Sequence, residues 1–239
     1  QLSDLNHLEQ MIATGDSTHI YLWNITPITD STSQLVVDVK DADYSLNNKL
    51  VIPFGDTDFE KQSRKTVTDF IESLNIHRKE FKTTFIGEDE LPSTYCACVE
   101  HKTTQSNKAF GMMESYPFLN SVIAGNGIQV NGIPFIETTD WNMQNDSISF
   151  NFCYPIIKTD SLPIVKNMVY KEFIGKKSLK AIYNGNYMTS DRAWYTLLDY
   201  AKENNIKIEQ KPIEFFFNNP NMGGDALRWK AEIFMPIAE

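Results

Sequence analysis

Two short stretches decide the fold of this chain: Ile148–Ile156, which reads ISFNFCYPI, and Trp229–Ile237, which reads WKAEIFMPI. Each alternates residues of different polarity, as a strand with two unlike faces does, and each ends in Pro-Ile. The two stretches lie 81 positions apart. Similar segments at a fixed spacing mark an internal repeat, so we expect a duplicated fold.

The residues upstream of these stretches repeat in the same order. Gly127–Val130 corresponds to Asn205–Ile208, 78 positions later, and Pro134 corresponds to Pro212 at the same spacing. A predicted helix precedes each pair, and a predicted strand precedes each helix. These strands and helices span residues 95–100 and 107–124 in the first copy, and 179–183 and 190–204 in the second. The sequence therefore predicts an α+β fold with two strand–helix–strand–strand modules, over about residues 91–160 and 164–239.

The helix of the second copy is the better specified of the two. Thr189, Ser190 and Asp191 can each cap its first turn, and an apolar stripe follows one face at helical spacing. The stripe consists of Ala193, Trp194, Leu197, Leu198 and Ala201. In the first copy, Pro117 falls inside the predicted helix, where proline is expected to produce a kink.

Three segments of the second copy carry a resemblance to a known family. They are Ala181–Tyr187 (AIYNGNY), Ala193-Trp194 followed by Leu197-Leu198, and Arg228–Ile237 (RWKAEIFMPI). Residues 91–239 resemble GyrI-like domains, which also form the effector-binding part of several bacterial, multidrug-responsive transcription activators. One departure is Tyr183, which stands where the family usually has a histidine. The resemblance implies small-molecule binding by two adjacent modules, with helices on one sheet face and a pseudo-symmetric ligand cleft on the other.

Glu232 is the candidate charged residue of this cleft. Strand alternation puts Ala231, Ile233 and Met235 on one side, toward the helix, and Arg228, Lys230, Glu232 and Phe234 on the other. The resemblance matches Glu232 to a glutamate at the floor of the ligand pocket in relatives. The alternative is an exposed glutamate paired with Lys230 or Arg228. Asn151 stands at the equivalent place in the first copy, so the cleft would hold one carboxylate and no catalytic pair.

Aromatic side chains are expected to form the walls of the cleft, because their faces suit flat and cationic organic ligands. The candidates are Tyr187, Trp194, Phe216 and Phe234, together with Tyr154 and Phe110 from the first copy. The alternative is plain core packing, which the apolar helix stripe favours for Trp194. Tyr187 follows a Gly-Asn turn, where a tyrosine needs no role in the core.

Residues 1–90 are predicted to form a separate α/β segment. It opens with a short amphipathic helix (Leu5, Leu8, Met11 and Ile12), continues with strands over residues 19–28 and 33–39, and ends with a helix over about 57–76. Strands followed by a long helix resemble the second half of a START-like helix-grip domain of the polyketide-cyclase kind. The alternative is a small accessory α/β cap on the main domain.

The composition narrows the classes of molecule to which the protein is expected to bind. A net charge of −9 over 239 residues argues against a surface that binds nucleic acid, and no apolar run is long enough for insertion into a membrane. Cys96, Cys98 and Cys153 follow no disulfide framework, which indicates a reducing, cytoplasmic compartment. The chain begins at Gln1, which leaves an upstream anchor or leader open. No metal-ligand spacing and no cofactor motif is present.

Three functions remain open. The first is binding of a hydrophobic or cationic small organic molecule, as a sensor or a sequestering protein. The second is hydrolysis of strained-ring or xenobiotic compounds, which some stand-alone GyrI-like proteins are described as performing. The third is interaction with a protein partner such as DNA gyrase. We favour binding, because it requires only Glu232 and the aromatic residues, and we assign no catalytic residue.

Overall fold

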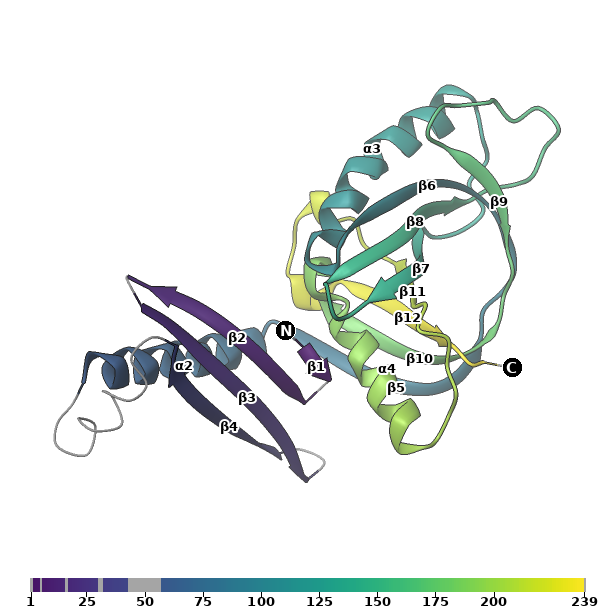
Figure 1. The fold of residues 1–239 in the computed structure, drawn as a ribbon. Helices are drawn as coiled ribbons and strands as arrows, with labels where there is room; N and C mark the ends of the chain where they lie inside the picture. Colours follow the sequence, from purple (N-terminus) through teal and green to yellow (C-terminus); the bar gives the residue numbers. More distant parts are fainter. Residues whose placement is uncertain (1, 5, 16, 30–31, 43–56, 239) are drawn as a thin grey trace. The chain divides into compact units, whose positions relative to one another are not determined.

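The computed structural model of the protein describes residues 2–4, 6–15, 17–29, 32–42 and 57–238. The chain folds into two compact units, and the larger begins at Arg78 (Figure 1). The strand over residues 81–90 pairs with the strand over residues 177–185 of the larger unit. Residues 78–90 therefore lie in the larger unit, and residues 143–145 are grouped with the smaller one.

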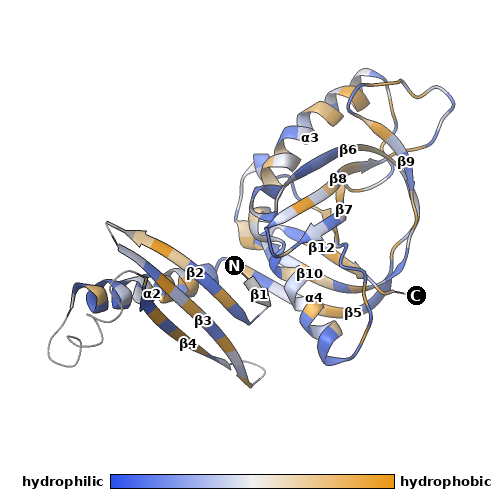
Figure 2. Ribbon diagram, viewed as in Figure 1, coloured by the Kyte–Doolittle hydropathy of each residue, from blue (hydrophilic) through white to orange (hydrophobic). Residues whose placement is uncertain are grey.

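The smaller unit is an antiparallel sheet with one helix. Its strands are β1 (Leu2–Asp4), β2 (His7–Thr14), β3 (Ser17–Thr29) and β4 (Thr32–Asp41), which pair in chain order, and its helix is α2 (Asp58–His77). Aromatic rings hold α2 against the sheet. The ring centroids of Phe70 and Trp23 are 4.6 Å apart, and those of Phe59 and His19 are 4.9 Å apart. Hydrophobic and hydrophilic bands alternate along these strands (Figure 2).

Residues 7–14 form strand β2, and the predicted N-terminal helix is wrong over this range. The spacing of Leu8, Met11 and Ile12 fits a helix, but the segment pairs with β3 along its whole length, Met11 opposite Ile20 for example. Pairing with a neighbouring strand outweighs a helical pattern in so short a segment. Leu5 lies outside the described residues. The other two strands and the long helix are confirmed, and the START-like resemblance stays a prediction.

The larger unit contains the two predicted modules. The first consists of β6 (Thr94–Thr104), α3 (Lys108–Gly125), β7 (Phe135–Asn142) and β8 (Ser147–Pro155). The second consists of β10 (Lys177–Gly185), α4 (Arg192–Glu203), β11 (Ile213–Phe216) and β12 (Lys230–Pro236). Two more strands, β5 (Phe81–Glu90) and β9 (Val169–Phe173), precede the modules, and the short 3₁₀ helices are η2 (Gln105–Asn107), η3 (Tyr187–Thr189), η4 (Pro220–Met222) and η5 (Ala226–Arg228). Helix α3 is continuous through Pro117.

A pseudo-twofold axis between β7 and β11 relates the modules. The strands of both modules, together with β5 and β9, form one antiparallel sheet in the order β5-β10-β12-β11-β7-β8-β6-β9 (Figure 1). Counted from the two ends of this order, β5 is equivalent to β9, β10 to β6, β12 to β8 and β11 to β7. The register repeats too, because Glu137 pairs with Asn151 as Phe215 pairs with Glu232. Asn151 and Glu232 therefore occupy equivalent positions on the same sheet face, which confirms the prediction from the repeat.

The sheet has a helix face, packed against α3 and α4, and an opposite face, here called the far face. On the helix face, Tyr183, Ala231 and Ile233 are fully buried. On the far face, Phe135, Ile213 and Phe234 form one apolar cluster with Cys98 and Cys153. Side chains are thus packed on both sides of the central strands.

Cys98 and Cys153 form a disulfide bond within the far-face cluster. They lie directly opposite each other on β6 and β8, so strand pairing brings them together and no framework of spacings is needed. Cys96 is free and buried. Burial, reinforced by the nearby carboxylate of Glu137, raises the pKa of the Cys96 thiol to about 12. The sequence had indicated reduced cysteines, and the structure instead pairs two of the three.

Candidate ligand-binding cavity

A cavity of about 390 Å³ opens on the helix face, between α3, η3 and the segment that follows β11. Its walls are mostly aromatic and methionine side chains: Tyr116, Phe152, Tyr154, Tyr187, Phe216, Phe217 and Trp229, with Met112, Met113 and Met188. The asparagines Asn186, Asn218, Asn219 and Asn221 also contribute to the lining. The cavity is of the size and composition that suit a small organic ligand.

Tyr187 is held rigidly in the cavity wall. The side chain of Asn186 accepts a hydrogen bond from the backbone N–H of Met188, which fixes the turn that presents the tyrosine. The Tyr187 hydroxyl donates to the backbone carbonyl of Lys230 (2.7 Å) and accepts from the backbone N–H of Asn218 (3.1 Å). Burial raises the pKa of Tyr187 to about 12. The phenol therefore stays protonated at neutral pH, and its hydroxyl is already engaged by the backbone.

The ring of Tyr187 packs with two other aromatic rings of the wall. Its centroid lies 4.9 Å from that of Phe216 on β11 and 5.8 Å from that of Trp229. Tyr116 of α3 accepts a hydrogen bond at its hydroxyl from the side chain of Asn219 (3.0 Å). The wall thus joins the first module, through α3, to the second module, through η3 and β11.

A buried ion pair lies beneath Tyr187. The Lys108 ammonium, at the start of α3, is 2.5 Å from the Glu214 carboxylate on β11, and both side chains are 0% exposed. The Ser190 hydroxyl lies 2.5 Å from the other oxygen of Glu214, and 3.0 Å from the backbone carbonyl of Tyr187. The sequence interpretation did not include Lys108 or Glu214. The available signal was a single carboxylate in the otherwise apolar run Ile213–Phe217.

The structure brings together some of the predicted site residues and separates others. Tyr187, Phe216 and Tyr154 line the cavity. Phe110 is 56% exposed and lies outside the lining. Trp194 is fully buried in the core, where its ring packs edge-on against Trp141 (4.9 Å), so the core alternative holds for it.

Glu232 and Phe234 lie on the far face, away from Tyr187. On β12, Ala231 pairs with Phe216 of the cavity wall, so the alternation of the strand turns Glu232 to the other side. The structure therefore does not bring Glu232 and Tyr187 together in one cavity. Strand periodicity had separated the two faces correctly, but the cavity opens on the face that carries the helices.

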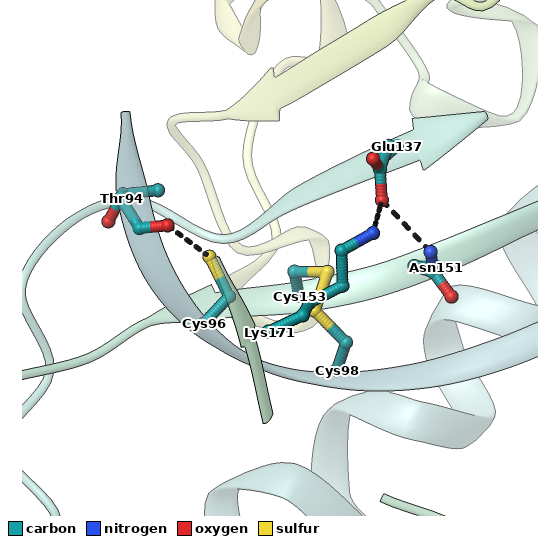
Figure 3. Close-up of a disulfide and its surroundings, with 7 residues drawn as sticks. All are labelled: Thr94, Cys96, Cys98, Glu137, Asn151, Cys153 and Lys171. Atoms are coloured by element: carbon teal, nitrogen blue, oxygen red, sulfur yellow. Dashed lines mark hydrogen bonds and ion pairs between the residues drawn. A yellow bond between two sulfur atoms is a disulfide. The ribbon is translucent and has the colours of Figure 1, made fainter. Parts of the chain in front are cut away.

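Glu232 is instead part of an ion-pair network on the far face. Its carboxylate is 2.6 Å from the Lys230 ammonium and 3.1 Å from the Lys180 ammonium. Partial burial acts to raise the pKa of Glu232, but the hydrogen bonds from Lys230 and Lys180 outweigh it and hold the pKa below its usual value. Asn151, at the equivalent position, donates to Glu137 (2.9 Å), which also contacts Lys171 (Figure 3).

The comparison with known families agrees with this architecture. The sequence profile of the GyrI-like small molecule binding domain matches residues 88–238, well over half of the chain. The chain belongs to the GyrI-like family. No curated protein matches it in sequence. Small-molecule binding is accordingly the general function of this GyrI-like protein.

Two solved structures show the GyrI-like fold at low sequence identity. The C-terminal domain of EcmrR is 14% identical, with a TM-score of 0.55 over 66% of this chain and 98% of that one. EcmrR in a complex with DNA is 12% identical, with a TM-score of 0.56 over 81% of this chain and 77% of that one. Within the described residues, no group of His, Cys, Asp or Glu side chains could hold a metal ion, and no helix could span a membrane.

Proposed function

We propose that the cavity on the helix face binds a flat aromatic organic molecule and prefers cations, so that the protein acts as a sensor or a sequestering protein. The observation that carries this proposal is the lining, which combines seven aromatic rings with three methionines and contains no charged side chain. Aromatic faces attract cations and stack on flat rings, and methionine side chains adapt to varied apolar shapes.

Hydrolysis finds less support in this geometry. A hydrolase of this kind needs a free carboxylate or another base beside a bound water. Within the described part of the chain, no carboxylate lines the cavity. The buried Glu214 carboxylate is engaged by Lys108 and Ser190, and the Tyr187 hydroxyl is engaged by the backbone. We therefore propose binding without catalysis.

Replacing Trp229 tests both the site and its preference for cations. Trp229→Leu keeps apolar bulk and removes the aromatic face. We expect about a tenfold weaker affinity for N-methylacridinium, a flat cation, because a cation–π contact of about 1.4 kcal/mol is lost. Affinity for neutral acridine at pH 8 should change less than about threefold. Fluorescence titration of each compound gives the two dissociation constants.

Glu232→Gln is the matched control, because Glu232 lies on the far face. Its affinities for both compounds should equal those of the unaltered protein. Equal losses for the cation and the neutral compound in Trp229→Leu would show that the cavity binds without preference for charge. No loss for either compound would show that the ligand binds elsewhere.

A further inference from the structure

The two ends of the large sheet are not equivalent. At one end, β5 pairs with β10 along all of Lys177–Gly185. At the other end, β9 pairs with β6 only from Thr94 to Cys98, although β6 continues to Thr104. Among the residues that the structure describes, none forms a strand beside the outer edge of β6 after Cys98. Half of this edge strand is therefore open.

The second module shows what occupies the equivalent place. Cys153 and Phe234 are equivalent positions of β8 and β12. Cys98 pairs with Cys153 and Lys180 pairs with Phe234, so Cys98 is equivalent to Lys180. The residues that follow, Val99–Thr103, are therefore equivalent to Ala181–Gly185. Residues Phe81–Phe85 of β5 cover Ala181–Gly185. The duplication thus predicts a strand beside Val99–Thr103 as well.

The helix above the open edge is also placed to cover a strand. In the second module, α4 reaches β5: Tyr200 stacks on Phe85 with ring centroids 3.9 Å apart, and the Thr196 hydroxyl lies 3.3 Å from that of Thr83. Asn126 and Asn204 are the C-terminal caps of α3 and α4. When the two helices are aligned at these caps, Tyr200 is equivalent to Val122, and Thr196 is equivalent to Phe118. Helix α3 therefore overhangs a place that holds no described strand.

A cavity of about 690 Å³ occupies this place. It is lined by Val99, Glu100 and His101 of β6 and by Glu114, Ser115 and Phe118 of α3, and its end is closed by residues 167–169. Glu100 and His101 point to opposite faces of the sheet, so the cavity wraps around the strand edge. The cavity therefore lies where a strand paired with Val99–His101 would run.

The backbone of β6 offers hydrogen bonds along this edge. The Cα atoms of Cys98 and Cys153 are 4.1 Å apart, as in a pair that shares no hydrogen bonds across the ladder. The N–H and C=O groups of Cys98 thus face outward, and by alternation so do those of Glu100 and Lys102. The side chains of Glu100 and Lys102 lie on the far face, and that of His101 lies on the helix face, where it contacts Ser115 of α3.

We propose that the outer edge of β6 at Val99–Thr103 binds an extended peptide segment of a partner protein as an added antiparallel strand. Backbone pairing supplies affinity and side chains supply selectivity in such complexes. The segment that fits has a basic residue opposite Glu100, an acidic residue opposite Lys102, and apolar residues on the alternate side, beneath Phe118. This surface is separate from the cavity proposed for the small molecule, and α3 lies between the two.

A second copy of this chain does not fit the open edge. Charge alone would allow it, since Glu100 of one copy would lie opposite Lys102 of the other. However, α3 overhangs the edge, and a twofold pairing would bring the two α3 helices into the same space. Helices pack no closer than 8–10 Å between axes. The occupant is therefore a single segment that carries no helix above it.

A peptide based on β5 serves as the probe. The peptide Phe81–Gly87 with Lys82→Glu and Thr84→Lys places an acid opposite Lys102 and a base opposite Glu100. We expect saturable binding to the full chain by fluorescence anisotropy of the labelled peptide, and none of a scrambled peptide. The protein variant Glu100→Lys with Lys102→Glu should bind this probe at least tenfold more weakly. It should regain affinity for the peptide with the opposite charges, which keeps Lys82 and carries Thr84→Glu.

Backbone methylation separates strand addition from charge attraction. N-methylation of the peptide residue opposite Glu100 removes a ladder hydrogen bond and should weaken binding at least tenfold. N-methylation of the next residue toward the N-terminus, opposite His101, leaves the ladder intact and should have little effect. Lys202→Glu, an exposed change on α4, is the protein control and should not alter binding. Absence of saturable binding, or equal effects of the two methylations, would overturn the proposal.

Discussion

Replacing Lys108 by methionine is expected to lower the free energy of unfolding by about 3–5 kcal/mol, because it leaves the Glu214 carboxylate buried without a counter-charge. The Lys108 ammonium lies 2.5 Å from Glu214 and 2.7 Å from the Ser190 hydroxyl, and no part of either charged side chain is exposed. It also lies 4.8 Å from the centre of the Trp194 ring. Urea denaturation monitored by tryptophan fluorescence measures the loss.

Two further variants identify the cause of this loss. Lys108→Met combined with Glu214→Leu removes both charges and should recover most of the stability, since apolar pairs commonly replace buried ion pairs at little cost. Ser190 keeps the Tyr187 carbonyl as a partner. Lys177→Met removes an exposed pair with Glu88 and should cost under about 1 kcal/mol. A double variant as unstable as the single one would show that packing, and not charge, explains the loss.

Loss of the disulfide bond is the second large effect. Cys98 and Cys153 close a loop with a sequence separation of 55, for which chain entropy predicts about 4 kcal/mol of stabilisation, within a usual range of about 2–5 kcal/mol. Cys98→Ala with Cys153→Ala should therefore unfold at a clearly lower urea concentration under oxidising conditions. The cross-link constrains the unfolded chain, so the folded variant should retain its secondary structure.

A reductant provides the control for this prediction. Adding it should lower the midpoint of the unaltered protein toward that of the double alanine variant, and should not change the variant itself. Cys96→Ala should leave the response to reductant intact, because Cys96 takes no part in the bond. Identical midpoints of the unaltered protein with and without reductant would contradict the expected stabilisation.

The repeat made most of the large sheet predictable. Pro-Ile at Pro155-Ile156 and Pro236-Ile237 marks the ends of equivalent strands, and the bridges Val130–Ile156 and Ile208–Ile237 show that the upstream matches are equivalent as well. Local patterns of this kind can be recognised in a sequence because strand pairing and helix capping need particular residue types at particular positions. The N-terminal strand β2 lacked such a pattern, so its type depended on a neighbour that the sequence did not identify.

The site was harder to predict than the fold. Alternation shows that the side chains of Glu232 and Ala231 point to opposite faces of the sheet, but it does not show which face carries the cavity. That depends on how α3 and η3 are spaced above the sheet. Lys108 and Glu214 are far apart in the sequence, and only the folded chain reveals that each neutralises the other. The disulfide bond depends in the same way on the register of β6 and β8.

The burial of Trp194 bears on how many molecules one chain can hold. The pseudo-twofold axis relates the ligand cavity to a second place, beside α4 and η2, where Trp194 is equivalent to Tyr116 and Gln105 to Tyr187. There the indoles of Trp194 and Trp141 fill the space, and Trp141 donates to Gln105 (2.8 Å). Duplication thus created two potential vacancies, and tryptophan occupies one of them. The proposed function therefore predicts that the helix-face cavity binds one small molecule per chain.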